Sequence, residues 1–310
     1  MLIKKDNFIF LLIHIKIMEL IMSVIYDTIK LIFFLFTISA GVGFFRTYIS
    51  EQKIKETLLI KHGFKGHLFA SLLGSVTHFS SKSSIKLFYN FLESGVPLGV
   101  SLSFLIASPI VNEYVAILML VFFGWKITLA YVFIGIFIGT FAGLILSKFN
   151  LEKYLYKKMK GKLVELERKT TIKNRIKIGL NEALTILKKL WIFLVLGIFL
   201  NAGIRYYFTG EGILKIVNSV GIFGVPIAIL IGVPFPGSGA AIIPIAVALF
   251  EKGIPLGTAL GFLMAVVALS LRRAKELRKI MEMKLIILFF TIIILSIILI
   301  SYAINFIQLF

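Results

Sequence analysis

Two lysines and one glutamate lie inside otherwise apolar stretches of the chain. Lys82 and Lys86 are four residues apart, so a helix would carry them on one face. Glu113, in the next apolar stretch, is the natural counter-charge for either lysine. Because an ionisable group at membrane depth is costly, these residues indicate a binding site with a charged ligand or partner. The alternative is that both lysines extend to the membrane interface and only their stems lie in the apolar layer.

Small and hydroxyl-bearing residues interrupt two apolar stretches, 67–93 and 225–252. The interruptions are FSSKSS at 79–84 and PFPGSG at 234–239. We expect helices to begin near Ser84 and Gly239, where unpaired N–H groups and the helix dipole favour an anionic group. The candidate substrate-binding residues are Ser80, Ser81, Lys82, Ser83, Ser84, Lys86, Asn112, Glu113, Pro236, Gly237, Ser238 and Gly239. The alternative is that small residues here only allow helices to pack closely.

The composition is that of a membrane protein. Of the 310 residues, 59% are hydrophobic and 16% are charged, whereas soluble domains have about 45–50% apolar and about 25% charged residues. The mean hydropathy is +0.99. The formal net charge of +19 comes from Lys and Arg that gather between apolar segments, a pattern typical of cytoplasmic loops. We therefore expect a multi-pass protein of the cell membrane that binds no nucleic acid.

Six segments have the length and composition of membrane spans: roughly 24–45, 98–122, 126–148, 184–208, 255–271 and 284–309. The basic stretches between them should all be cytoplasmic, and these are 46–66, 148–177 and 272–284. This requirement is met only if each of the two interrupted stretches enters the membrane and returns on the same side. Such re-entrant hairpins need protein or a watery cavity around them, because non-helical backbone cannot face lipid.

The second hairpin region repeats the first. The segment Glu93–Gly99, ESGVPLG, aligns with Glu251–Gly257, EKGIPLG, at an offset of 158 residues, and Ser80 aligns with Ser238. Each half then has three spans and one hairpin, and an odd number of crossings turns the second half upside down. The sequence therefore predicts an all-α polytopic membrane protein of two inverted-topology repeats, each with about three spanning helices and one broken re-entrant helical hairpin. The expected divisions are an N-terminal segment 1–23, a first membrane repeat 24–148, a basic cytoplasmic loop 149–183 and a second membrane repeat 184–310.

Several kinds of chemistry find no support in the sequence. Without cysteine there is no disulfide, thiol nucleophile or Cys-ligated metal. His62, His67 and His78 are too scattered to be metal ligands, and the sequence has neither a phosphate-binding loop nor a nucleophile elbow. We therefore predict no metal site, no cofactor and no catalytic residue, and we do not expect an enzyme. Any coupling to ATP would need a separate subunit.

Two long segments carry a family resemblance. Ser80–Glu113, SSKSSIKLFYNFLESGVPLGVSLSFLIASPIVNE, and Val233–Leu263, VPFPGSGAAIIPIAVALFEKGIPLGTALGFL, resemble the predicted permease family that includes organoarsenical efflux permeases. The resemblance extends into FFGWK at 122–126 and covers most of the chain from about residue 24 onward. It implies a multi-spanning permease that exports small solutes.

One departure from the family pattern bears on the substrate. In many relatives the first break resembles Cys-Ser-Cys followed by small residues and a proline, but this chain has Ser80, Lys82 and Lys86 at those positions. Soft thiolate coordination of a trivalent arsenical is therefore impossible there. The sequence predicts a membrane permease or secondary transporter that exports a small, here anionic, solute through a midplane site at the two broken hairpins. The alternative is a non-transporting membrane scaffold derived from a permease. Expected partners are the lipid bilayer and a small-molecule substrate, and the sequence leaves homo-oligomerisation open.

Overall fold

The part of the chain that the structure describes is mostly helical. This computed structural model describes residues 18, 22, 25–26, 28–30, 32–45, 47–48, 56–59, 63–76, 81–111, 113–156, 171–207, 219–234 and 239–307; most of the predicted N-terminal segment lies outside them. Helices long and apolar enough to cross a membrane are Thr28–Phe45, Phe122–Ser147, Leu256–Leu277 and Met283–Ile307. They coincide closely with four of the six predicted spans. The prediction of an all-α membrane protein is therefore confirmed.

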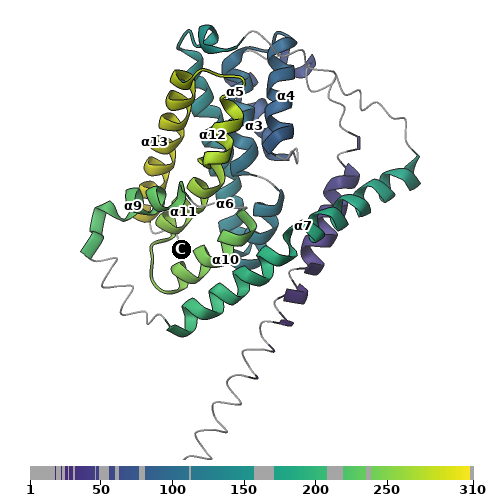
Figure 1. Ribbon diagram of the computed structural model, residues 1–310, viewed down its shortest axis with the longest axis vertical. Helices are drawn as coiled ribbons and strands as arrows, with labels where there is room; N and C mark the ends of the chain where they lie inside the picture. Colours follow the sequence, from purple (N-terminus) through teal and green to yellow (C-terminus); the bar gives the residue numbers. More distant parts are fainter. Residues whose placement is uncertain are drawn as a thin grey trace, which may run out of the picture.

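The helices divide between the two halves of the chain. The first half contains α3 (Gly63–Val76), α4 (Ser81–Glu93), α5 (Leu98–Ile110) and α6 (Glu113–Ser147). After a 3-10 turn, η1 (Glu152–Tyr154), the second half contains α7 (Ile172–Tyr207), η2 (Gly221–Phe223), α9 (Gly224–Gly232), α10 (Gly239–Glu251), α11 (Leu256–Ala268), α12 (Leu271–Leu277) and α13 (Met283–Ile307). Because α7 begins inside the predicted loop 149–183, the end of that loop is helical. In Figure 1, α3, α4 and α5 lie in the upper part of the molecule and α9, α10 and α11 lie in the lower part.

The connections α4–α5 and α10–α11 are built alike. Gly95 and Gly253 have φ angles of 85° and 101°, a left-handed conformation that costs other residues roughly 1–2 kcal/mol. Each glycine ends its helix in a Schellman motif, in which the N–H of the following residue donates to the carbonyl five residues before it, over 2.9 Å in the first half and 3.1 Å in the second. Pro97 and Pro255 then precede the next helix with φ angles of −54° and −55°, close to the value that the proline ring imposes.

The packing around these hairpins also recurs. α10 and α11 begin and end 158 residues after α4 and α5 do. A Cβ on Gly74 of α3 would lie 2.7 Å from the Phe104 carbonyl oxygen, and a Cβ on Gly232 of α9 would lie 3.0 Å from the Phe262 carbonyl oxygen. Glycine at both places lets the backbones approach closely, as is common between membrane helices. The two units therefore share helix bounds, turn geometry and packing.

The segment 98–122 is not the continuous helix that the sequence predicts. α5 ends before Val111, whose φ and ψ are −108° and 83°, and α6 begins at Glu113. α6 is itself interrupted at Gly124, with φ 78° and ψ 174°. Pro109, inside α5, removes a backbone donor near the first of these breaks. The single-helix prediction is therefore wrong, although the predicted boundary between this segment and the next coincides with Gly124.

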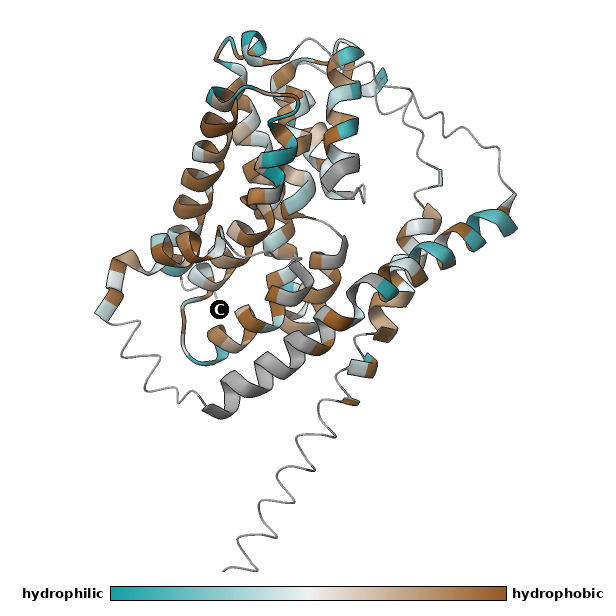
Figure 2. Ribbon diagram, viewed as in Figure 1, coloured by the Kyte–Doolittle hydropathy of each residue, from teal (hydrophilic) through white to brown (hydrophobic). Residues whose placement is uncertain are grey.

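The basic stretch 272–284 is not a loop throughout, which corrects a second prediction. α12 follows α11 after a short break at Leu269 and Ser270, and the two helices together form the candidate span Leu256–Leu277. Figure 2 shows the hydrophilic residues of α12 between hydrophobic helices. The connecting loop therefore starts only after Leu277, and the charges of α12 belong to the helical body.

Small residues allow α5 and the second segment of α6 to pack closely. A Cβ on Gly139 would lie 2.8 Å from the Ala107 Cβ and 3.1 Å from the Ser103 carbonyl oxygen, and a Cβ on Gly143 would lie 2.9 Å from the Gly99 carbonyl oxygen. As the position advances along α6, its contact moves back along α5, so the two segments are antiparallel. Close packing of this kind stabilises helix pairs in lipid, where the hydrophobic effect between helices is absent.

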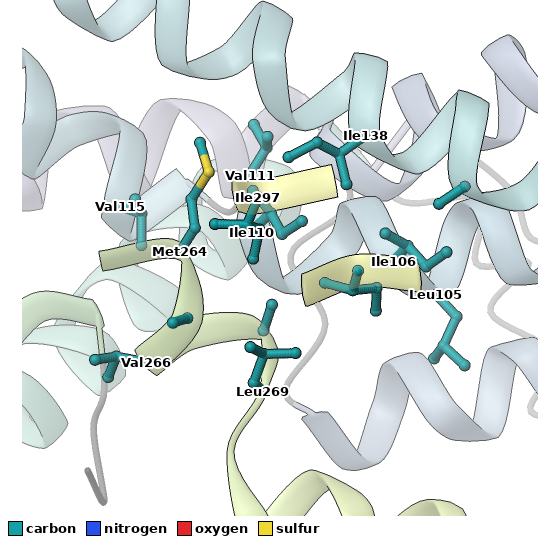
Figure 3. Close-up of a cluster of buried hydrophobic side chains, with 14 of the residues drawn as sticks. Leu105, Ile106, Ile110, Val111, Val115, Ile138, Met264, Val266, Leu269 and Ile297 are labelled. Carbon is teal, nitrogen blue, oxygen red and sulfur yellow. The ribbon is translucent and has the colours of Figure 1, made fainter. Parts of the chain in front are cut away.

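The interrupted helices of the two halves meet in one buried apolar cluster (Figure 3). Val111, at the end of α5, is 3% exposed, and Leu269, at the end of α11, is 4% exposed. Around them lie Ile110 of α5, Met264 of α11 and Ile297 of α13. α5 and α11 are also in direct contact. The breaks in the two helices therefore lie at the junction of the two halves.

Specific contacts join the three basic stretches to one another. Arg175, near the start of α7, donates from Nη1 to the Thr47 carbonyl over 2.6 Å, and its guanidinium lies 4.0 Å from the centre of the Tyr48 ring. These contacts connect the first basic stretch with the end of the second. An isolated antiparallel β-bridge between Leu155 and Met281 connects the second with the third. Their mutual contacts agree with placement on one side of the membrane, which the charge pattern predicts.

Candidate substrate site

The first break places several candidate residues in the opening turn of α4. α4 begins at Ser81, earlier than the predicted start near Ser84. Residues 81–83 therefore lie inside its first turn, although their side chains are outside the described part of the structure. Lys82 and Lys86 lie one turn apart on this helix, as their spacing predicts, and Lys86 is exposed.

The second break precedes α10, which begins at Gly239 as the sequence predicts. Glu113 is the first residue of α6, and its side chain is outside the described part. Other candidates fall wholly outside the described residues, namely Ser80, Asn112, Pro236, Gly237 and Ser238. The structure therefore places the starts of α4, α6 and α10, while the pairing of Glu113 with a lysine stays a prediction.

Ser84 is the candidate residue whose buried contact the structure shows. Its side chain is 2% exposed, and its Oγ lies 2.9 Å from the Oγ of Ser108, which is also buried. One hydroxyl donates to the other across the boundary between α4 and α5. This bond holds the first turn of α4 against the end of α5, next to the break at Val111.

A buried arginine from the second half reaches the same end of α5. Arg273 of α12 is 3% exposed, and its Nη2 donates to the Leu105 carbonyl over 2.7 Å. In a regular α-helix that carbonyl would accept from the N–H of residue 109, but Pro109 has no N–H. Arg273 therefore supplies the donor that the proline removes from α5.

These groups come together from three helices. A helical carbonyl points toward the residues three and four positions ahead, so the Leu105 carbonyl points toward the turn that carries Ser108. α4 also contacts α12 directly. The Ser84 hydroxyl, the Ser108 hydroxyl and the Arg273 guanidinium therefore surround one turn of α5, and they join elements of both halves.

Two atoms in this region have no hydrogen-bond partner among the described residues. The Nε of Arg273 and the Oε2 of Glu276 are both buried and unpaired. Glu276 lies three residues after Arg273, on the same face of α12, and the two side chains interact electrostatically. A buried polar group without a partner costs about 1–3 kcal/mol, and more when it is charged. Charged groups at such depth indicate a functional site.

Sequence reasoning missed Arg273 and Glu276. Arg and Lys directly after an apolar segment are typical of a cytoplasmic loop. This pattern does not distinguish a buried arginine from the exposed basic residues around it. The available signal was helical spacing, because Arg273 lies four residues after Leu269 and four before Leu277. Both leucines are buried, so the arginine belongs to the apolar face of a continued helix.

One histidine packs inside the first half. His67 of α3 is buried, and its Nδ1 lies 2.8 Å from the Ser103 Oγ of α5. Within the described ranges, no three His, Asp or Glu side chains are grouped to hold a metal ion. The contact of His67 is thus with a serine of the neighbouring helix.

Comparison with known proteins gives a family match. Residues 16–306 match a family described as a predicted permease, which confirms the resemblance seen at the two breaks. No curated protein and no solved structure matches the chain. The match spans both halves, and the apolar helices support an integral membrane protein. The chain belongs to the predicted permease family.

Proposed function

We propose that this permease is a secondary transporter of the inverted-repeat type. It exports a small anionic solute across the cell membrane, through a site near the midplane at the two broken hairpins. Inverted repeats with discontinuous helices around a midplane site are a recurrent transporter architecture.

The recurrence of the hairpin geometry carries this proposal. The α4–α5 and α10–α11 units have equal bounds at an offset of 158 residues and the same glycine-proline turn. The first unit nevertheless lies in the upper part of Figure 1 and the second in the lower part. An inverted repeat requires equivalent units at opposite ends of the molecule. The two hairpins would then enter the membrane from opposite sides.

The helix starts that follow the two breaks favour an anion. α4 and α10 each begin after a break, and their first N–H groups have no intrahelical partner. The dipoles of such half-helices place partial positive charge at these ends. Lys82, in the first turn of α4, adds a full positive charge there. We therefore expect Lys82 to contribute to substrate affinity.

A transport assay with a binding control tests the proposal. The purified protein would be reconstituted in proteoliposomes and offered small oxyanions, organic anions and arsenicals, with thermal stabilisation measured in parallel. A ligand at about 100 times its Kd should stabilise the folded protein by about 2.7 kcal/mol. We expect one anion both to stabilise and to be transported, and Lys82→Ala to reduce both effects.

The matched control is Lys279→Ala, which removes an exposed lysine outside the hairpins and should leave both readouts unchanged. Absence of transport for every anion by well-folded protein would contradict the proposal and favour a membrane scaffold. Full anion transport by Lys82→Ala would contradict the assignment of the site to the first break.

A further inference from the structure

The two unpaired atoms on α12 are chemically complementary. The Nε of Arg273 carries an N–H and can only donate, whereas an ionised Glu276 carboxylate can only accept. Both atoms are buried, and they lie on one face of the same helix. A single ligand that satisfies both atoms would present an acceptor oxygen to the arginine and a hydrogen-bond donor, such as a hydroxyl, to the glutamate.

We infer that Arg273 and Glu276 together bind a monoprotonated oxyanion, such as hydrogen phosphate or an alkylphosphonate, an inference that rests on the proposed function. An ionised oxygen of the ligand accepts from the Arg273 Nε–H. The ligand hydroxyl donates to the Glu276 Oε2. The guanidinium offsets one negative charge of the ligand, and its fixed fork of donors suits oxyanions better than an ammonium does.

The surroundings of Arg273 fix its orientation. Its Nη2 is held by the Leu105 carbonyl at 2.7 Å, so the guanidinium cannot turn freely to follow a ligand. Ser84 and Ser108 lie around the same turn of α5, and α4 contacts α12. α4 therefore packs beside the helix that carries the arginine, and the dipole of α4 at its first turn adds to the attraction for an anion.

Glu276 gives this site a means of selection. Sulfate and phosphate are both tetrahedral dianions or close to it at neutral pH, but only phosphate keeps a proton. A sulfate oxygen would lie against the Glu276 carboxylate with no hydrogen between them, and like charges in contact disfavour the wrong ligand. Sites built to bond a ligand hydroxyl reject analogues that lack it by large factors.

Binding of three probe anions to the purified full-length protein tests the inference. Inorganic phosphate, methylphosphonate and sulfate would be titrated at neutral pH by calorimetry. We expect the wild type to bind phosphate and methylphosphonate about 100-fold or more tightly than sulfate. Glu276→Gln should bind sulfate and phosphate within about tenfold of each other, because an amide also donates hydrogen bonds. Since the amide is isosteric with the carboxylate, this variant should keep the fold.

Two arginine variants complete the test. Arg273→Lys should weaken binding of all three anions at least about tenfold, because an ammonium does not reproduce the guanidinium fork. Arg278→Lys, at an exposed arginine just after α12, is the matched control and should bind like the wild type. Equal affinity of the wild type for sulfate and phosphate would overturn the inference, as would a failure to bind either phosphorus oxyanion or unchanged selectivity in Glu276→Gln.

Transport by the same proteins separates this inference from the proposed function. If the reconstituted wild type moves an anion, and both Glu276→Gln and Arg273→Lys move it equally well, the inference fails and the proposed function stands. If phosphate binds with the expected selectivity but no solute is transported, the proposed function fails and the assignment of the site stands.

Discussion

At the scale of single residues, the bond between Arg273 and the Leu105 carbonyl links a proline in one half to an arginine in the other. The positions equivalent to Pro109 and Arg273, displaced by 158 residues, are Val267 and Val115. Neither the proline nor the arginine therefore recurs. The joint absence of both residues from the equivalent positions is expected, because a proline inside a helix frees a carbonyl that then requires a donor from outside the helix.

A double-mutant cycle measures this link. Arg273→Met alone should lower the free energy of unfolding by about 1–3 kcal/mol, because it leaves the Leu105 carbonyl without its donor. In a Pro109→Ala background the loss should be smaller by about 1 kcal/mol, since residue 109 then donates to that carbonyl within α5. Thermal unfolding in detergent gives both values. Strictly additive effects of the two substitutions would show that proline and arginine are not coupled.

At the scale of helices, glycines determine how closely neighbouring elements pack. Gly139 of α6 faces the Ala107 Cβ and the Ser103 backbone at distances that leave no room for a methyl group. Gly41, in the span Thr28–Phe45, has nothing within 4 Å of the place its Cβ would take. The two positions therefore differ in packing, although both are glycines within apolar helices.

Alanine substitutions at these glycines should have opposite effects. Gly139→Ala should destabilise the protein by about 1–3 kcal/mol, because overpacking separates α6 from α5. Gly41→Ala should be neutral or stabilising by up to about 1 kcal/mol, since alanine favours helix more than glycine does. Melting temperatures of the two purified variants, compared with that of the wild type, measure these effects. An equal loss at both positions would mean that helix contact at Gly139 is not what matters.

The two hairpin turns, at Gly95 and Gly253, offer a further check at the same scale. Gly95→Ala and Gly253→Ala each force a residue with a Cβ into the left-handed region, at a cost of roughly 1–2 kcal/mol. Because the two turns are built alike, the losses should agree within about 0.5 kcal/mol. Unequal losses well beyond that margin, measured by thermal unfolding, would show that the turns are not equivalent.

The helix ends at the two turns could be predicted, whereas the breaks inside the helices could not. Gly95 and Pro97 form a local signal, since positive φ and a fixed proline ring act within a few residues. Pro109, Asn112 and Glu113 surround Val111, but the apolar residues on both sides of them favour one long membrane span, so the break could not be told from a polar group within a continuous helix. The carbonyl of Ile110 instead accepts from the Tyr131 hydroxyl, over 2.9 Å, a partner that only the folded structure brings near.

The buried side of α12 was not predicted, because its charged residues are typical of a loop. Six charged residues follow Ala268 within a short stretch, and their density favours a solvated loop. Which member of such a cluster is buried depends on the position of α5, whose Leu105 carbonyl lacks a helical donor. The candidate site was accordingly predicted at the helix starts of α4 and α10, and the tertiary contacts of the arginine then showed that it is buried.

At the scale of the whole molecule, the central claim is that two similar halves face opposite sides of the membrane. The Leu155–Met281 bridge holds the loop after α6 against the loop after α12. The α4–α5 turn lies toward the upper end of Figure 1, and the α10–α11 turn lies in the lower part. An inverted repeat therefore places Glu93 and Glu251, which are equivalent and both exposed, on opposite sides of the bilayer.

The absence of native cysteine allows this to be measured without background labelling. Single-cysteine variants Glu93→Cys, Glu251→Cys and Lys153→Cys would be treated with a membrane-impermeant maleimide, in intact cells and in inverted vesicles. Lys153, in the basic stretch after α6, is exposed and reports the cytoplasmic side. We predict that Glu93→Cys reacts from the same side as Lys153→Cys and that Glu251→Cys reacts only from the other. Reaction of Glu93→Cys and Glu251→Cys from one and the same side would contradict the inverted repeat.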